Sequence, residues 1–355
     1  MSKTNASKKP TPTKPKPRSR WRWFKLLLLL IVIGVAAAGW KAYEHYQQFL
    51  NTPLATGNAE PTLTVESGDS FDDILKKIRG IGLREGHDLE WQLLAFQLRV
   101  TTKLQVGEYA MGHGLTPAGL LNKLASGKVI QHRFTIVEGW NFRELRAALA
   151  ADPTVVQTLE GISDEEVMQK LGAEGVHPEG RFLPETYHYT KGVDDLRLLK
   201  RSFLAMQELL NEEWPKRDPE LPLDSPEEAL ILASIIEKET GQASERPEIA
   251  GVFVRRLKLG MLLQTDPTVI YGIGEAYNGN ITRTHLRTDT PYNTYTRAGL
   301  PPTPIAMPGR AAVEAALHPA DSKALYFVSR GDGSHVFSAT LAEHNRAVRR
   351  YQLRR

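Results

Sequence analysis

The chain has 355 residues, of which 41% are apolar, and it contains no cysteine. This length is enough for two or three domains with real hydrophobic cores. The lack of cysteine excludes structural disulfides, thiolate nucleophiles and thiolate-bound metal centres. The net charge of +4 is concentrated at one end, because residues 1–25 hold nine bases and no acid, and subtracting them leaves −5 for the rest. We therefore expect no nucleic-acid partner.

The N-terminal segment predicts a membrane anchor. Residues 1–22 mix Lys and Pro with Ser and Thr, a composition typical of a disordered tail, here basic and cytoplasmic. Residues 23–40 form the apolar run WFKLLLLLIVIGVAAAGW, with tryptophan at both ends and bases before it. We expect a single transmembrane helix in the cell inner membrane, with the rest of the chain in the periplasm. The alternative is a cleaved signal peptide, with the alanines at 36–38 as its small-residue cleavage site.

The next part predicts a linker and a small domain. Residues 41–61 contain several helix breakers and are interpreted as a polar linker. Residues 62–134 alternate short strands with amphipathic helices, and a Gly-Asp-Ser turn follows the first strand. A strand, this turn and an amphipathic helix form a pattern that is similar to the LysM glycan-binding module. The alternative is a small α+β spacer that holds the following domain away from the membrane.

The remaining residues, 135–355, predict a mainly helical catalytic domain with a small β portion, so the expected fold class of the whole chain is α+β. A hairpin is expected near the end of the chain, and residues 175–192 are interpreted as a polar, aromatic loop suited to sugar or peptide contacts. The chain has no phosphate-binding glycine loop, no HExxH and no GxSxG motif, and its ten histidines form no i, i+4 pair. We therefore expect no metal and no organic cofactor.

One buried helix ends in an acidic cluster. Ser225 and Pro226 suit the cap and the first position of a helix, and residues 229–236 are apolar except for one serine. This run ends at Glu237 and Glu239. A carboxylate at the end of a buried helix is either paired with a base, or its pKa rises until it can donate a proton near neutral pH.

Four long motifs carry a resemblance to a known family. The segments ASIIEKETGQASERPEIAGVFVRRL, LQTDPTVIYG, PYNTYTRAGLPP and YFVSRGDGSHVFSATLAEHN resemble the YceG-like family of endolytic murein transglycosylases. The similarity covers roughly residues 63–345. Thr303 departs from the family pattern, which has glycine at this point, so the detailed shape of that loop stays open.

The resemblance implies a lyase that acts on peptidoglycan glycan strands. Such an enzyme cuts the MurNAc-β-1,4-GlcNAc bond within strands, leaves 1,6-anhydro-MurNAc ends and terminates the elongation of nascent strands, with peptidoglycan synthases as expected partners. One carboxyl group suffices, because it first protonates the leaving oxygen and then takes the proton of the C6 hydroxyl. A hydrolase typically needs a second carboxylate. The alternative from a different class is a non-catalytic glycan-binding scaffold that recruits synthases.

Two glutamates compete for the catalytic role. Glu237 and Glu239 are about 200° apart around a helix, so they face different sides. Their apolar neighbours slightly favour Glu239, whereas the resemblance assigns the role to Glu237. Glu239 is then expected to form a structural pair with Arg246 or Arg255, and Glu245 is a weaker rival. The bland alternative is that Glu237 is itself half of a salt bridge at the helix end.

The same motifs supply the expected substrate contacts, chosen by motif position and side-chain chemistry: Gln264, Asp266, Tyr271, Asn293 and Tyr295. Their amide, carboxylate and aromatic side chains suit hydrogen bonding and stacking with a sugar. Asp266 alternatively orients a partner or caps the turn at Pro267.

Overall fold

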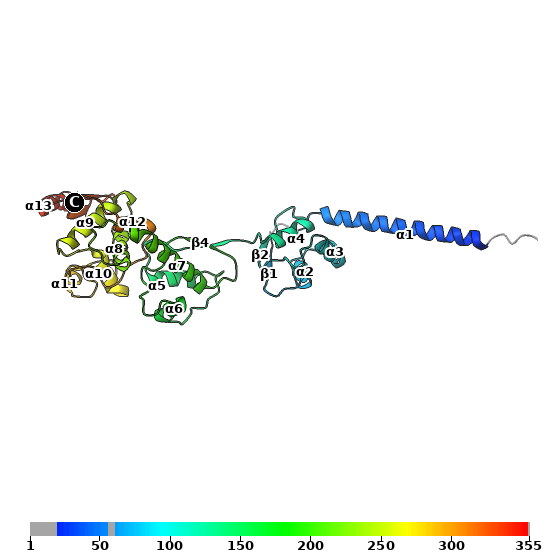
Figure 1. The fold of residues 1–355 in the computed structure, drawn as a ribbon, viewed down its shortest axis with the longest axis horizontal. Coiled ribbons are helices and arrows are strands. Elements are labelled where there is room, and N and C mark those ends of the chain that lie inside the picture. The colour runs from blue at the N-terminus through cyan, green and yellow to red at the C-terminus, as the bar shows by residue number, and fades with distance from the viewer. Residues whose placement is uncertain (1–19, 56–60, 354–355) are drawn as a thin grey trace, which may run out of the picture. The chain divides into compact units, whose positions relative to one another are not determined.

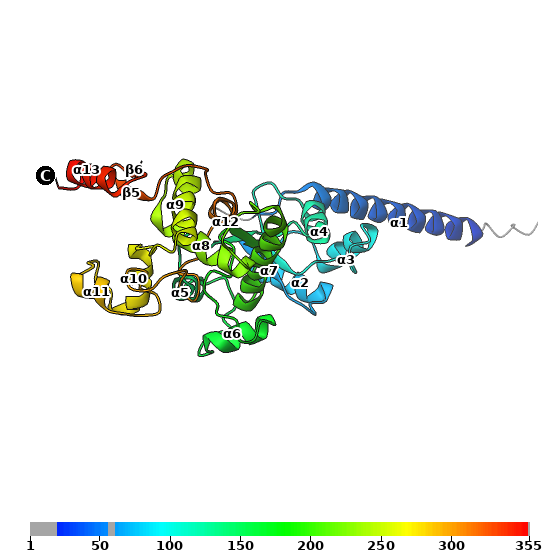
Figure 2. The same cartoon turned by 60° about the vertical axis from the view of Figure 1, so that its left-hand side comes forward.

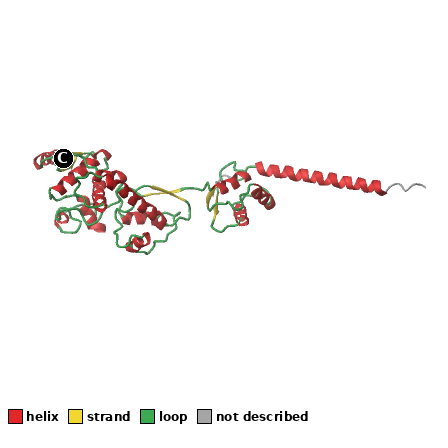
Figure 3. Ribbon diagram, in the orientation of Figure 1, coloured by secondary structure: helices red, strands yellow, loops and turns green. Residues whose placement is uncertain are grey.

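The computed structural model describes residues 20–55 and 61–353 (Figure 1). Most of the predicted basic tail, residues 1–22, lies outside the described residues. The chain divides into two units, Met1–Val129 and Ile130–Arg355, and each is described by itself. Helices predominate and the strands form only two-stranded sheets (Figure 3), so the predicted α+β class is confirmed.

The first unit begins with the long helix α1, Arg20–Asn51. Within the described residues it is the one helix long and apolar enough to cross a membrane, which is compatible with an anchor. The helix continues eleven residues past position 40, so residues 41–51 of the predicted linker are helical. The reason is tertiary: Phe49 is 4% exposed and packs in the core of the first unit. Burial of such a side chain stabilises the last turns of the helix.

The rest of the first unit packs three helices on a two-stranded antiparallel sheet. Its elements are β1 (Thr62–Val65), α2 (Phe71–Gly80), α3 (Asp88–Gln97), β2 (Gly107–Ala110) and α4 (Pro117–Ser126). Leu63 pairs with Tyr109 across the sheet, and both are buried together with Trp91. Ser70 caps α2 through a capping box, as its place after the Gly-Asp turn predicts. The likeness to LysM stays a prediction.

The second unit is mainly helical (Figure 2). Its first half contains β3 (His132–Thr135), α5 (Phe142–Ala150), α6 (Asp164–Leu171), β4 (Thr186–Tyr189) and α7 (Asp195–Glu213). Its second half contains α8 (Pro226–Glu239), α9 (Arg246–Lys258), α10 (Asp266–Ile273), α11 (Arg283–Arg287), α12 (Arg310–Leu317), β5 (Tyr326–Ser329), β6 (His335–Ser338) and α13 (Leu341–Tyr351). The segment interpreted as a loop at 175–192 contains β4, which pairs with β3.

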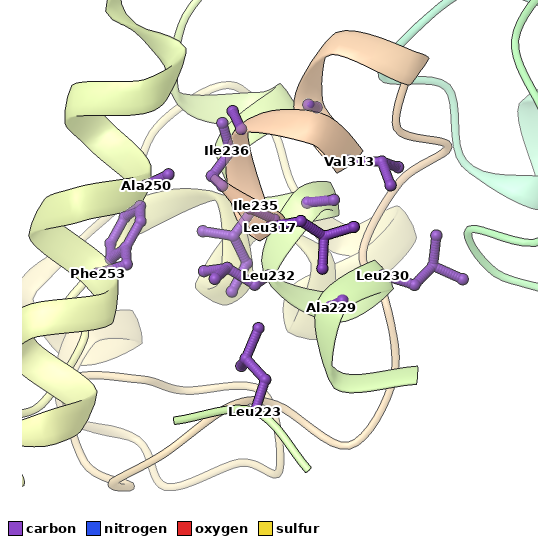
Figure 4. Packing of buried hydrophobic residues seen from close by; sticks show 14 of the residues in the cluster. Leu223, Ala229, Leu230, Leu232, Ile235, Ile236, Ala250, Phe253, Val313 and Leu317 are labelled. Atoms are coloured by element: carbon purple, nitrogen blue, oxygen red, sulfur yellow. The ribbon is translucent and has the colours of Figure 1, made fainter. Parts of the chain in front are cut away.

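Helix α8 is the centre of the second unit (Figure 4). It starts as its sequence predicts, with the Ser225 hydroxyl accepting the N–H of Glu228 and proline at the first position. All eight residues from 229 to 236 are buried. They pack against α9 through Ala250 and Phe253 and against α12 through Val313 and Leu317. This packing holds the final turn, with both candidate glutamates, in a defined position.

Candidate active site

Glu237 is held by two donors. Its Oε1 lies 3.1 Å from Nη2 of Arg246, and its Oε2 accepts the N–H of Gly309 at 3.0 Å. The side chain is only 5% exposed. Burial raises the pKa of the Glu237 carboxyl, whereas the Gly309 N–H and Arg246 act in the opposite direction. Glu237 therefore forms an ion pair with Arg246 at the end of the helix, which was the alternative to a catalytic role.

Arg246 also reaches a second carboxylate. Its Nη2 lies 3.5 Å from Oε2 of Glu138, whose side chain is half exposed. Gly309 lets this carboxylate approach, because a Cβ at position 309 would collide with the end of the Glu138 side chain. We call Glu138, Glu237, Arg246 and Gly309 the Arg246 cluster. It joins α8, α9, the start of α12 and the segment before α5.

Glu239 has different surroundings. It accepts the hydroxyl of Thr265, and desolvation, followed in effect by the nearby carboxylate of Asp266, raises its pKa to about 7. Thr265 has the largest opposing effect. The predicted pairing of Glu239 with Arg246 or Arg255 is wrong. Arg246 lies on the other side of α8 beside Glu237, and Arg255 binds the carbonyls of Ala320 and Ala324.

The weaker rival Glu245 is occupied by a structural contact. Its carboxylate accepts the backbone N–H of His335 at 3.0 Å and lies 2.7 Å from Nδ1 of the same residue. Glu245 thus ties the start of α9 to strand β6.

Glu239 lines a cleft of about 550 Å³ between α8, the start of α10, the β5–β6 hairpin and α13, which we call the Glu239 cleft. Three of the five predicted substrate residues, Gln264, Asp266 and Tyr295, line the same cleft. The Tyr295 hydroxyl donates to Asp266 at 2.6 Å. Gln264 adopts a positive φ of 50°. This backbone conformation is uncommon for a residue with a side chain, and such residues cluster at functional sites. A titratable acid is thus placed among polar and aromatic groups in a concave surface.

Tyr271 lines a second cleft, of about 790 Å³, which we call the Tyr271 cleft. Its lining includes Asn141, Phe142, Glu179, Lys238, Tyr271 and Tyr292. The hydroxyl of Tyr292 lies 2.9 Å from Oγ1 of Thr303, the residue that departs from the family pattern. Glu237 lines neither cleft, although its chain neighbour Lys238 lines the Tyr271 cleft.

Glu179 is a residue of this cleft that sequence reasoning did not single out. It is 3% exposed, and it accepts the N–H of Phe142 and the hydroxyl of Tyr271, each at 3.1 Å. Burial raises its pKa to about 7. The sequence showed Glu179 only as one polar residue of a loop, because its partners lie 37 and 92 positions away.

Asn293 is the predicted substrate residue that lies in neither cleft. It is 1% exposed, and its Nδ2 donates to the carbonyls of His285, Leu286 and Thr288. In this structure the side chain therefore holds its own loop in shape. In the described part of the chain, no three His, Asp or Glu side chains are grouped so that they could hold a metal ion.

Comparisons with known proteins agree on one family. A model of the YceG-like family matches residues 63–350. A Bacillus subtilis (strain 168) protein named endolytic murein transglycosylase is 33% identical over 278 residues, 72% of this chain and 77% of that protein. A protein of the same name from Streptococcus pneumoniae serotype 2 (strain D39 / NCTC 7466) is 25% identical over 357 positions, which cover 88% of this chain. The chain spans 62% of the length of that relative.

A solved structure has a similar fold. The crystal structure of a yceG-like protein from Listeria monocytogenes aligns with a TM-score of 0.51 and 27% identity, covering 82% of this chain and 99% of that one. The family model matches most of the chain, and it includes both candidate glutamates, the Tyr271 cleft and all of the Glu239 cleft except Gln352. The chain therefore belongs to the YceG-like family.

Proposed function

We propose that this protein cleaves the MurNAc-β-1,4-GlcNAc bond within peptidoglycan glycan strands and leaves 1,6-anhydro-MurNAc ends. Its family makes it a lytic transglycosylase, since its curated relatives are named endolytic murein transglycosylases. What we propose beyond this is the bond that is cleaved, the anhydro product and the residues that act. One observation carries it: Glu239, with a pKa of about 7, lines a cleft together with Gln264, Asp266 and Tyr295.

We assign the acid and base role to Glu239 in preference to Glu237, to which the resemblance pointed. A general acid must reach substrate and hold a proton near the working pH. Glu239 lines a cleft and its pKa is raised to about 7, whereas Glu237 lines neither cleft and its carboxylate is bound by Arg246 and the Gly309 N–H. Those two donors favour the ionised form of Glu237. The catalytic role of Glu237 remains the rival proposal, and the experiment below tests both.

The reaction then follows from one carboxyl group. Protonated Glu239 gives its proton to the glycosidic oxygen as the bond from C1 to that oxygen breaks. The resulting carboxylate takes the proton of the C6 hydroxyl, whose oxygen bonds to C1 and closes the anhydro ring. Glu239 ends the cycle protonated, as it began. The Thr265 hydroxyl, which donates to Glu239, stabilises the carboxylate between the two steps.

For the substrate we propose contacts in both clefts. In the Glu239 cleft, Gln264, Asp266 and Tyr295 offer an amide, a carboxylate and a ring to a sugar. In the Tyr271 cleft, Tyr271 and Tyr292 lie with their ring centroids 4.9 Å apart and supply an aromatic wall. Asn293 would act indirectly, by holding its loop.

We further propose that α1 anchors the protein in the inner membrane, with its N-terminus cytoplasmic and residues 41–355 periplasmic. The bases before the apolar run support this orientation. An anchored enzyme meets strands as synthases release them at the membrane, so it would act there as a terminator of strand elongation.

The test is a product analysis of purified, uncrosslinked glycan strands by mass spectrometry. Full-length protein is compared with Glu239→Gln, Glu237→Gln and, as a control, Glu212→Gln on the exposed face of α7. Anhydro ends from wild type, control and Glu237→Gln, but not from Glu239→Gln, support the proposal. Loss only in Glu237→Gln moves the role to that residue. Reducing ends would mean hydrolysis, and no cleavage by wild type would favour the scaffold.

A further inference from the structure

Helix α3 exposes an apolar stripe on the surface of the first unit. Leu89, Leu93 and Phe96 are 77%, 47% and 76% exposed. Their spacing of i, i+4 and i+7 places them within about 60° of one another around the helix. Large apolar side chains gathered on one exposed face mark an interaction surface.

The stripe lies beside the end of the proposed anchor. The Tyr46 hydroxyl of α1 donates to Oε1 of Gln97 at 2.6 Å, and Nδ1 of His45 lies 2.9 Å from Oε1 of Glu90. Glu90 and Gln97 are about 10 Å apart along α3, whereas their partners are neighbours on α1. Helix α3 therefore crosses α1 and does not run along it. If α1 stands along the membrane normal, α3 lies nearly parallel to the membrane surface.

The stripe points toward the apolar part of α1. The opposite face of α3, with Trp91, Leu94 and Ala95, is buried in the core of the first unit. That core also holds Phe49 and Leu54, at and beyond the end of α1. The core is thus on the side toward which α1 ends, and since the stripe is on the opposite face of α3, we infer that it faces the side from which α1 comes. On that side the apolar residues of α1 are exposed along their length.

The distance along α1 fits the thickness of the headgroup layer. His45 follows Trp40, the tryptophan at the end of the apolar run, by five residues, or about 7.5 Å. The hydrocarbon core of a bilayer is about 30 Å thick within about 40–45 Å overall, which leaves a few ångströms of interface on each side. A helix at this level reaches the boundary of the acyl chains with its leucine and phenylalanine side chains, as interfacial helices do.

We propose that α3 lies in the membrane interface and that the first unit rests on the bilayer through Leu89, Leu93 and Phe96. This inference depends on the anchoring role proposed for α1. Lipid is the occupant because the anchor keeps the stripe at the bilayer surface, so weak apolar contacts suffice. Three side chains are too few for a stable interface with a second protein, which takes roughly 800 Å² on each partner.

Position-specific labelling of the full-length chain tests this proposal, because the chain has no native cysteine. Single cysteines are introduced as Leu93→Cys in the stripe, Val32→Cys within the apolar run, and Ser126→Cys at the exposed end of α4 as a control. Each is labelled with an environment-sensitive fluorophore and placed, one chain per disc, in nanodiscs of phosphatidylethanolamine and phosphatidylglycerol. Emission, iodide quenching and quenching by spin-labelled lipids are measured.

We expect the fluorophore at position 93 to emit at a shorter wavelength than the fluorophore at position 126. It should be quenched little by iodide and strongly by lipids that carry the spin label near the headgroup. In a second variant, Leu89→Ser with Phe96→Ser, iodide access at position 93 should rise while the circular dichroism spectrum is unchanged. If position 32 is in lipid but 93 behaves like 126, the inference is overturned and the anchor stands. If position 32 is also in water, both fail. Protection at 93 only with two chains per disc would assign the stripe to a second copy.

Discussion

Glu237 and Glu239 stand two residues apart on the last turn of α8, yet they bind opposite kinds of partner. Glu237 faces the cationic Arg246 and a backbone N–H. Glu239 faces the neutral hydroxyl of Thr265, with the anionic Asp266 nearby. At Glu237 two donors thus oppose the effect of burial on the pKa, whereas at Glu239 a neighbouring carboxylate adds to it, as their positions on different sides of one helix allow.

The first prediction concerns activity. Glu239→Gln should lower the cleavage rate by about 10²–10⁴-fold, because removal of a general acid and base typically costs this much. Glu237→Gln should retain most of the rate but lose about 1–3 kcal/mol of unfolding free energy, since it weakens a buried ion pair. Turnover on glycan strands and urea unfolding of both variants check this. Equal activity loss in the two variants with equal stability would contradict the division of roles.

The second prediction concerns the pH dependence of that activity. Asp266 raises the pKa of Glu239, and the acid must be protonated to act, so cleavage should fall as pH rises through about 7. Asp266→Asn removes a negative neighbour and lowers the pKa of Glu239, so the fall should begin at lower pH. Tyr295→Phe is the matched control, because it removes the contact with Asp266 but keeps the charge. An unchanged pH profile in Asp266→Asn would mean that the charge of Asp266 does not affect the pKa of the catalytic acid.

A third prediction uses the same pKa for stability. The folded-state pKa of Glu239, about 7, lies above its ordinary value of 4.5. Its protonated form therefore favours the folded state, with full effect below about pH 4.5 and a loss as pH rises through about 7. Glu239→Gln, which stays neutral, should raise the melting temperature at pH 8.5 relative to wild type and change it little at pH 4.5. A uniform shift at both pH values would mean that packing, not charge, is responsible.

The parts of this molecule that the sequence predicts are those set by local chemistry. The caps at Ser70 and Ser225 are found where the sequence predicts them, because an N-cap needs only residues within one turn. The end of α1 was missed, since what extends it to Asn51 is the burial of Phe49 in a core formed by distant residues. The helix propensity of residues 41–51 does not indicate that packing.

The candidate site divides in the same way. Motif position and side-chain chemistry predict Gln264, Asp266 and Tyr295 as substrate residues, and they line one cleft with Glu239. Contacts between segments were beyond prediction: the pairing of Arg246 with Glu237 and Glu138, and that of Tyr271 with Glu179. The choice between the two glutamates depends on those contacts, because each lies on a partly buried helix end and only its partners distinguish it.

The fourth prediction concerns Glu179 in the Tyr271 cleft. Glu179→Ala leaves the buried N–H of Phe142 without its acceptor, and such a loss costs about 1–3 kcal/mol of unfolding free energy. Tyr271→Phe, which removes one donor and leaves the N–H satisfied, should cost less and should act mainly on KM if the cleft binds glycan. Urea unfolding and steady-state kinetics of the two variants separate these effects. A stable Glu179→Ala would mean that water replaces the carboxylate.

The fifth prediction tests the close approach at Gly309. In Gly309→Ala the new Cβ collides with the carboxylate of Glu138, which must move away from Arg246. The crowding and the lost ion pair should together cost about 1–3 kcal/mol of unfolding free energy. Because the atom in the way is the end of a side chain, Glu138→Ala should relieve the clash, so the double variant should be more stable than the two single effects added together. Thermal or urea unfolding of the three variants measures this coupling. Strict additivity would mean that Glu138 moves away from position 309 without cost, and that its contact with Arg246 contributes nothing to the fold.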